Sequence, residues 1–496
     1  VAKDTICCLV SDLLFDGMCD KLIKTAGTKE KRKEVLFMET HKKLKFTEKL
    51  SYGIADLPEA ANSIIAAFLT MFYTDNIGLA AAAVGTMFFI SKLFDGISDI
   101  LAGILIDKTR TKWGKARPWL LWLSVPTGLS IALIFFIPQD GSKTMQMIYA
   151  FVTYNLFTSI MFTITGIARS SLLALMTQDF RERGSMASFG MFFGLAGTIL
   201  GCSLTFPLIF KLGGDIRAWR ILFGIYGVIV TAGLLAGFFM SKEYVTSVEA
   251  TSGEEVQKIS FKEGIKLFFT NKYLILALVA TVLVNFVTQI NSCSQTYFYK
   301  YTMGNEMLTT TLNLVSIIPI LIGIVLFVGP CMAKFGKKKC MYIGIIGQLI
   351  GSLIRGFAGM TQSVPLLIAG TVISGAVTGL LAVPVSTLFA DGIDYGEYKT
   401  NRRIEGMGSA ITSFSQKISS GLAQASIGWI LGLTGYISGQ AVQSGITNMG
   451  IISMYAWMPA ALLLAIFIIL KFCYKYEDIA DEVINTLENR KKQARN

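Results

Sequence analysis

Long stretches without a charged side chain recur along this chain of 496 residues. Most of them are about as long as a helix must be to cross a hydrocarbon layer of roughly 30 Å. A spanning barrel is excluded, because its strands would alternate polar and apolar residues over about ten positions. Apolar residues make up 53% of the chain and charged residues 16%. The pattern therefore predicts an all-α membrane protein with about twelve spanning helices. The charge-free stretches are Leu120–Ile137, Ile221–Met240, Thr309–Met332, Met341–Ile354, Val364–Ala390, Leu422–Ile446 and Thr447–Leu470.

The basic residues, which give a net charge of +12, lie in short clusters between the apolar stretches. Because they form no single basic domain, a nucleic-acid partner is not expected. Every second connection is basic, whereas residues 74–78 and 434–445 contain no Lys or Arg. The positive-inside rule then predicts a multi-pass protein of the cell membrane with both termini in the cytoplasm. The connection 211–220, with Lys211, Arg217 and Arg220, is an exception to the rule.

One long polar stretch interrupts the apolar part of the chain, with about six apolar stretches on either side of it. We expect two six-helix bundles joined by a cytoplasmic linker. The leading segment is expected to be non-native or disordered, with Met38 as the natural start, because Lys33-Glu34-Val35 can be encoded by a ribosome-binding sequence. The expected divisions are 1–37 for this leader, 38–50 for a cytoplasmic segment, 51–240 for the first bundle, 241–271 for the linker, 272–472 for the second bundle and 473–496 for a cytoplasmic tail.

A short motif occurs once in each half. Gly103 and Asp107 precede a basic turn at Gly114-Lys115, and Gly329 and Ala333 precede a basic turn at Gly336-Lys337. This arrangement is expected of a transporter built from two related halves around a central site. Close packing of helices at glycine is the alternative explanation.

Two acidic residues interrupt the apolar segment FFISKLFDGISDILAGILI. Asp95 and Asp99 are four residues apart, which turns a helix by about 400°, so both carboxylates lie on one face. Each carboxylate costs about 2.5–3.5 kcal/mol near the centre of a bilayer, so the pair needs a partner or a function. We expect a site for Na⁺, Li⁺ or H⁺, with a structural ion pair to Lys92, Arg169 or Lys417 as the alternative.

Other polar residues within apolar segments are candidates for solute binding. Lys417 fits a counter-ion to the aspartates as well as a solute contact, and Asp56 and Glu59 fit an interface as well as a site. Asn285, Gln289 and Asn291 carry amides that can bind sugar hydroxyls or join helices. Arg355 is expected to extend to the membrane surface. His41 is the single histidine and the eight cysteines have no paired spacing, so neither a metal site nor a cofactor is expected.

Several separated motifs resemble the glycoside–pentoside–hexuronide:cation symporters, the melibiose-carrier branch of the major facilitator superfamily. They are YGIADLPEAANSIIAAFLTMFYTDNIGL, KLFDGISDILAGILIDKTRTKWGKARPW, QDFRERG, ADGIDYGEYKTNRRIEG and SFSQK, in the family's order over Leu50–Tyr474. The resemblance implies the major facilitator fold, a cation site at Asp95, Asp99 and Thr163, and a role for Lys417. It also places Glu59 near a sugar-binding acid.

The family's galactoside-binding residues are not preserved. By the resemblance they fall on Gly166, Ser170, Met191 and Ala382. This loss argues for a different solute, since sugar sites combine polar groups with an aromatic platform. Arg169 has no counterpart in the melibiose pattern and favours a uronide or another acidic glycoside. The candidate solute-binding residues are Glu59, Arg169, Lys417, Asn285 and Gln289.

The expected function is symport of a sugar, glycoside or uronide with a cation by alternating access. A monomer in the lipid bilayer is expected, and no Ser/His/Asp set or phosphate loop indicates an enzyme. The alternatives are a sodium-linked carrier of lysolipids or other amphipathic solutes, and a non-transporting membrane sensor or scaffold. The candidate gating residues are Asp107, Arg110, Arg117, Asp394, Tyr395 and Glu397.

Overall fold

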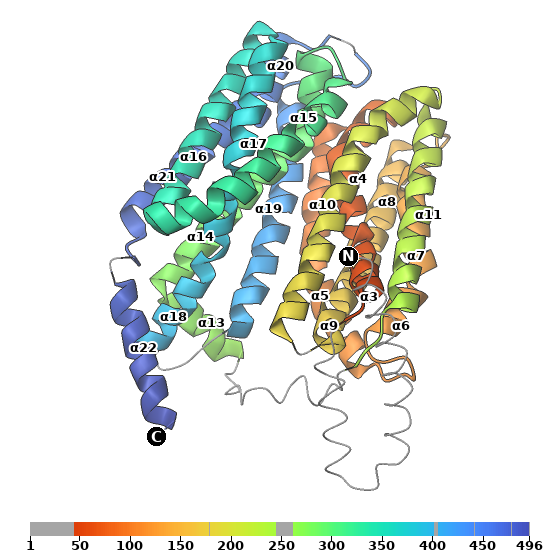
Figure 1. Ribbon diagram of the computed structural model, residues 1–496. Helices are drawn as coiled ribbons and strands as arrows, with labels where there is room; N and C mark the ends of the chain where they lie inside the picture. Colours follow the sequence, from red (N-terminus) through yellow and green to blue (C-terminus); the bar gives the residue numbers. More distant parts are fainter. Residues whose placement is uncertain are drawn as a thin grey trace, which may run out of the picture.

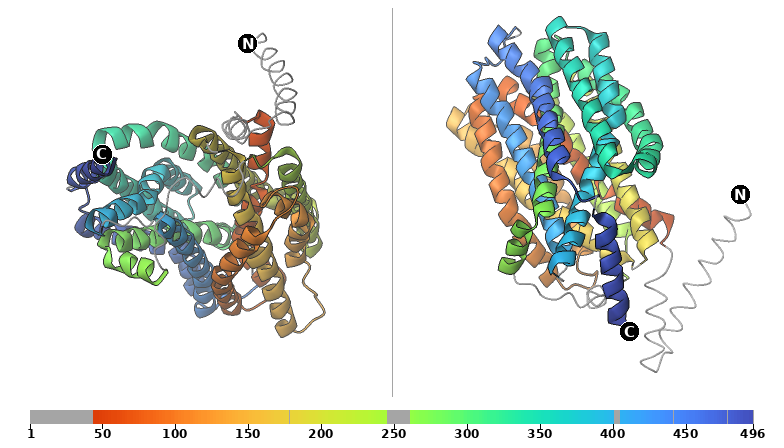
Figure 2. Two further views of the ribbon diagram at one scale, coloured as in Figure 1. Left: turned by 90° about the horizontal axis from the view of Figure 1, so that it is seen from below. Right: turned by 90° about the vertical axis from the view of Figure 1, so that its left-hand side faces the viewer.

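The computed structural model describes residues 44–177, 179–244, 261–400, 405–440, 442–477 and 479–495. Regular structure in these ranges is helical apart from one isolated bridge between Thr111 and Gly114. The helices form two bundles that lie side by side (Figure 1), and the view from below shows the same separation (Figure 2). We call the bundle α3–α11 the first half and the helices α13–α22 the second half. The expected leader 1–37 and much of the expected linker 241–271 lie outside the described residues.

The first half begins with a helix that is interrupted near Asp56 and continues to a wide π turn. Its elements are α3 (Phe46–Ile54), α4 (Leu57–Met71), η1 (Phe72–Asn76), α5 (Ala81–Lys108), α6 (Arg117–Trp122), α7 (Ser124–Phe135), α8 (Lys143–Asn155), η2 (Leu156–Phe162), α9 (Thr163–Met176), α10 (Phe180–Lys211) and α11 (Ile216–Met240).

The second half repeats this plan and adds a helix at each of its ends. Its elements are α13 (Phe261–Thr270), α14 (Lys272–Tyr297), η3 (Phe298–Thr302), α15 (Leu308–Ile322), η4 (Gly323–Val328), α16 (Gly329–Thr361), α17 (Val364–Ser386), α18 (Leu388–Thr400), α19 (Glu405–Leu433), α20 (Gly445–Ile452), η5 (Ser453–Trp457), α21 (Met458–Cys473) and α22 (Ala480–Arg495).

Seven helical stretches of the described chain are long and apolar enough to cross a membrane, by length and composition alone. One of them, Leu308–Thr361, is broken at Gly336, where the backbone leaves the helical region. Helices with several charges, such as α5, fall outside this count. The all-helical membrane fold is therefore confirmed, and the number of twelve spans stays a prediction.

The two basic turns have the same construction in both halves. Gly114 has φ +109° and Gly336 has φ +77°, a backbone region that residues with a Cβ rarely adopt. The Glu243 carboxylate accepts the N–H groups of residues 115, 116 and 117 at 2.9, 2.9 and 2.8 Å. The Glu477 carboxylate accepts the N–H of Lys338 at 2.7 Å. In each half an acid just beyond the last helix of the bundle therefore binds the turn that follows the second helix, as expected of related halves.

Helix α6, which follows the first of these turns, and α22, which follows Glu477, lie at one end of the molecule, at the bottom of Figure 1. We call it the basic end, and the other end, with the connections 77–80 and 434–444, the opposite end. The halves contact each other through α5 with α19, α4 with α14 and α10 with α15. Charged residues placed on these helices can therefore meet across the boundary between the halves.

Glycines allow some helices to approach until their backbones touch. On α7 and α11, a Cβ at Gly227 would overlap the carbonyl oxygen of Gly128, whereas a Cβ at Gly224 on the same helix would meet nothing within 4 Å. Helix association in lipid depends on such close packing. The Gly128–Gly227 crossing therefore fixes the packing of the first half.

Replacing Gly227 by leucine should lower the free energy of unfolding by about 1–3 kcal/mol, because the new side chain forces α7 and α11 apart. Thermal unfolding of the purified protein in detergent measures this change. Gly224→Leu is the matched control on the same helix, and we expect its unfolding midpoint to equal that of the native protein. Equal midpoints for both variants would contradict this packing.

Candidate functional site

Helix α5 carries Asp95 and Asp99 where the first half faces α19 of the second half. The Asp95 residue is 2% exposed, and the Asp99 side chain is 34% exposed. Lys417 of α19 contacts both residues: its Nζ lies 2.5 Å from Asp99 Oδ2 and donates to the Asp95 carbonyl oxygen at 3.1 Å. Lys417 thus contacts the carboxylate of Asp99 and the backbone of Asp95, one turn earlier on α5. We call Asp95 and Asp99 the carboxylate pair.

Each carboxylate of the pair has a lysine partner. Lys92 Nζ lies 2.8 Å from Asp95 Oδ2 within α5, and Lys417 provides the partner of Asp99 from the other half. The structural ion pairs named as the alternative are thus present for Lys92 and Lys417. They do not exclude a cation site, because a proton or metal cation that reaches the carboxylates competes with the ammonium groups for the same oxygens.

Ser159 and Asn155, which the sequence did not single out, complete the surroundings of Asp95. The Ser159 hydroxyl donates to Asp95 Oδ1 and also lies 3.1 Å from Asn155 Oδ1. Both residues stand on the helix that continues into α9, and Ser159 lies within the wide turn η2. Ser159 lies one turn and Asn155 two turns before the predicted Thr163, and this spacing was the available signal.

Thr163 lies just beyond this group. Its hydroxyl donates to the carbonyl oxygen of Thr158 at 3.2 Å, a step of five residues that belongs to the wide turn. Thr163 is buried, and no hydrogen bond joins its side chain to the carboxylate pair within the described chain. The described residues contain no cluster of three or more His, Cys, Asp or Glu that could hold a metal ion. A cation at the carboxylate pair would therefore need further oxygen ligands from hydroxyls, amides, carbonyls or water.

Arg169 of α9 forms its ion pair with Asp56. It was considered above as a structural partner of Asp95 and Asp99. Its guanidinium lies 2.8 Å from Asp56 Oδ1 and donates to the Tyr52 hydroxyl at 3.2 Å. Gly190 and Gly194 of α10 leave room for this contact, since a Cβ at either would approach the Asp56 carboxylate within 3.5 Å. The positive charge of Arg169 is therefore already balanced by Asp56.

The remaining predicted solute-binding residues lie apart from one another. Glu59 is exposed on α4 and has no hydrogen bond or ion pair among the described residues. Asn285 and Gln289 are half-buried on α14, one turn apart. Their roles stay predictions.

The predicted gating residues of the first half stand at the basic end. Asp107 forms an ion pair of 2.5 Å with Lys115, although its side chain is 72% exposed. Arg110 is exposed, and Arg117 donates to the Phe238 carbonyl oxygen at 2.7 Å while its guanidinium lies over the Phe238 ring. These contacts stay within the first half.

The predicted gating residues of the second half, Asp394, Tyr395 and Glu397, lie on α18. Tyr395 is buried against the Tyr273 ring, with ring centroids 4.7 Å apart, and the Glu397 carbonyl accepts from Arg490 at 3.4 Å. Asp394 is half-buried on the same helix. The sequence missed Asp391, which binds Lys337 at 2.5 Å and the Tyr474 hydroxyl at 2.7 Å. These contacts likewise stay within one half.

At the opposite end, by contrast, a group of contacts joins the two halves. Asp75 at the end of η1 forms an ion pair of 2.8 Å with Lys300 and accepts from the hydroxyls of Tyr301, at 2.5 Å, and Tyr436. The neighbouring Thr74 hydroxyl lies 2.8 Å from that of Tyr297. We call this group the Asp75 latch. Sequence reasoning passed over it because its segment was read only for its lack of basic residues.

Comparison with known proteins agrees with this architecture. The family model described as MFS/sugar transport protein matches residues 51–478. The chain belongs to this family of membrane transporters. Its resemblance to the glycoside–pentoside–hexuronide:cation symporters is thereby confirmed.

This chain is similar in sequence to two relatives and in structure to one solved transporter. The isoprimeverose transporter of Lactiplantibacillus pentosus is 29% identical, over 90% of this chain and 92% of the relative. The glucuronide carrier protein homolog of Escherichia coli strain K12 is 29% identical, over 89% and 95%. The crystal structure of a D-xylose–proton symporter matches with a TM-score of 0.62 and 17% identity, over 87% and 98%, which supports the fold alone. None of these supports the lysolipid carrier or the sensor.

One prediction for the transporter is wrong. Arg355 does not extend to the membrane surface, because it is 6% exposed and points into the second half. Its guanidinium donates to the Ser352 hydroxyl at 3.0 Å and lies over the ring of Tyr455, 4.9 Å from the centroid. The proximity of Arg355 to the end of its apolar segment suggested a surface position, but the side chain lies against Tyr455 of η5 and Gly370 of α17 instead.

Replacing Asp75 by asparagine should open the opposite end of the transporter, because the amide cannot balance Lys300 and about 1–3 kcal/mol of charge-assisted hydrogen bonding is lost. Spin labels at the exposed Gln139 and Gln440, one in each half, report the separation by pulsed electron resonance. We expect a new population at longer distance. The matched control Asp140→Asn alters an exposed acid in the connection 136–142 and should leave the distances unchanged. Identical distributions for native protein and Asp75→Asn would show that the latch does not hold this state.

Proposed function

We propose that this transporter carries a sugar, glycoside or uronide together with a cation by alternating access of its two halves. The names of the relatives support the solute class, since one is an isoprimeverose transporter and the other a glucuronide carrier homolog. The chain covers more than nine-tenths of both relatives, so the likeness extends over the whole transport unit.

The observation that carries this proposal is the ion pair between Lys417 and Asp99 across the boundary of the halves. A cation bound at the carboxylate pair competes with the Lys417 ammonium for the same oxygens. Its arrival therefore weakens one contact between the halves and changes the relative free energies of their two arrangements. The Ser159 hydroxyl offers a neutral oxygen to the same cation.

The latch supports a state that is closed at the opposite end, while the contacts found at the basic end remain within each half. In our proposal the basic end faces the cytoplasm, as the distribution of Lys and Arg predicts for a protein of the cell membrane. The solute then exchanges with the cytoplasm in this state. The opposite arrangement would release the latch and bring the gating residues of the two halves together.

The membrane potential can drive this cycle. One charge that moves through about 100 mV supplies about 2.3 kcal/mol, which concentrates a neutral solute nearly fiftyfold. Na⁺, Li⁺ and H⁺ are all compatible with two carboxylates and a hydroxyl. Glu59 and Arg169 remain the candidate solute contacts of the first half.

Asp95→Asn and Asp99→Asn should each reduce cation-driven uptake at least tenfold, because each variant removes a charge that attracts the coupling ion. Uptake of labelled glycosides and uronides by proteoliposomes, with Na⁺, Li⁺ and H⁺ gradients in turn, measures this effect. Asp140→Asn removes an acid outside the site and should retain native uptake. Full cation dependence in both site variants would refute the proposed coupling.

Lys417→Gln should shift the cation dependence in the other direction. Without the competing ammonium, the carboxylates bind the coupling cation more tightly, and the concentration for half-maximal stimulation should fall severalfold. A cation titration of exchange in proteoliposomes reports this value. Lys471→Gln, at the exposed end of α21, is the matched control with no expected change. A higher half-maximal concentration in Lys417→Gln would contradict competition between lysine and cation.

A further inference from the structure

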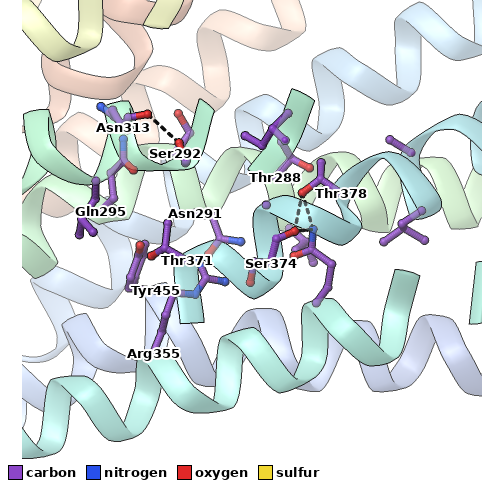
Figure 3. Close-up of a pocket in the computed structure, with 18 of the residues that line it drawn as sticks. Thr288, Asn291, Ser292, Gln295, Asn313, Arg355, Thr371, Ser374, Thr378 and Tyr455 are labelled. Atoms are coloured by element: carbon purple, nitrogen blue, oxygen red, sulfur yellow. Dashed lines mark hydrogen bonds between the residues drawn. The ribbon is translucent and has the colours of Figure 1, made fainter. Parts of the chain in front are cut away.

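A cavity of about 260 Å³ with several polar side chains in its lining lies inside the second half, among α14, α15, α16 and α17, with Tyr455 of η5 at its wall (Figure 3). Its volume lies just below the roughly 300–1,000 Å³ of pockets for drug-sized ligands, so it suits a small solute. It is separate from the carboxylate pair, none of whose residues line it. Helices α14 and α15, which form part of its wall, also pack against the first half.

Four side chains of this cavity have buried polar atoms without a hydrogen-bond partner in the described structure. They are Asn291 Oδ1, Asn313 Nδ2, Arg355 Nε and Ser374 Oγ. Arg355 and Ser374 are 6% and 7% exposed. A buried polar group without a partner costs about 1–3 kcal/mol, so their concentration around one cavity indicates a missing polar occupant.

Arg355 also lacks a counter-ion. Its described contacts are the neutral hydroxyl of Ser352 and the ring of Tyr455, and no Asp or Glu lines the cavity. Arginine stays charged within proteins, and an unbalanced charge at membrane depth is costly. Arg169 differs in this respect, because Asp56 already balances it. Of the two arginines, Arg355 is the one whose environment calls for a negative ligand.

The structure makes room for this arginine. A Cβ at Gly370 of α17 would lie 2.9 Å from Arg355 Cγ, and a Cβ at Gly351 of α16 would overlap the Ser374 hydroxyl. Glycine at both positions therefore lets α16 and α17 bring Arg355 and Ser374 to the cavity. Water could satisfy the amides and the hydroxyl, but it supplies no negative charge.

We propose that this cavity, the Arg355 cavity, binds a monosaccharide-sized uronate. The guanidinium pairs with the carboxylate of the ligand, since its planar donors match that group. The unpartnered acceptor of Asn291 and donor of Asn313 bind sugar hydroxyls, which both donate and accept. Tyr455 provides an aromatic wall. The proposal deepens the proposed function by naming acidic sugars as the solute class.

A direct measurement of ligand binding tests this inference and does not require transport. Calorimetry on the purified full-length protein in detergent compares D-glucuronate with neutral D-glucose and with sulfate. The native protein should bind glucuronate at least tenfold more tightly than either. Arg355→Gln should weaken glucuronate binding at least tenfold and change glucose binding less than twofold. Arg217→Gln, at an exposed position of α11, is the matched control and should change glucuronate binding less than twofold.

A second variant tests the cavity independently, in case Arg355→Gln does not fold. Asn291→Asp keeps the arginine but adds a negative charge to the cavity, and it should weaken glucuronate binding while glucose binding persists. Gel filtration and thermal unfolding establish that each variant is folded.

Several results would overturn the proposal: no glucuronate binding by the folded native protein, equal affinity for sulfate, or native glucuronate affinity in both cavity variants. A greater loss in Arg169→Gln than in Arg355→Gln would also overturn it. Cation coupling that survives in Asp95→Asn and Asp99→Asn would instead reject the proposed coupling and leave this binding site in place.

Discussion

The contact between Lys417 and the carboxylate pair is the constraint on which the rest of the arrangement depends. It joins charges of opposite sign from the two halves where α5 packs against α19, and removing either partner would leave the other charge unbalanced between the helices. Lys92 and Ser159 hold Asp95 in position from within the first half. The group is neutral as a whole, and in the proposed coupling a small cation replaces a lysine in it. This exchangeability makes an internal ion pair suitable for coupling.

The ends of the molecule differ in what their polar contacts join. At the basic end, Glu243 and Glu477 bind equivalent turns and stabilise each half separately. At the opposite end, the Asp75 latch joins one half to the other. Rigid halves with one exchangeable boundary are what alternating access requires. The duplicated turns keep the bundles intact while the boundary contacts change.

Two arginines within the helical bundles differ in whether they have a counter-ion. Arg169 has Asp56 and Tyr52 as partners, and glycines of α10 fit closely around this pair. Arg355 has a hydroxyl, an aromatic ring and an open polar cavity. The charge of Arg169 is therefore balanced within the first half, whereas no acid among the residues that line the cavity balances Arg355.

The sequence by itself determined that this is a helical membrane protein, because its long apolar runs require lipid. It also determined the carboxylate pair of α5 and the duplicated basic turns, because both follow from the spacing of residues along the chain. Tertiary structure alone decided the partners. Lys417 and Asp95 are 322 positions apart, and only the packing of α5 against α19 brings them together. Likewise, the wide turn η2 places Ser159 rather than Thr163 on Asp95. Which acid meets which base depends on how helices cross and rotate, and a single sequence does not contain that information in any local pattern.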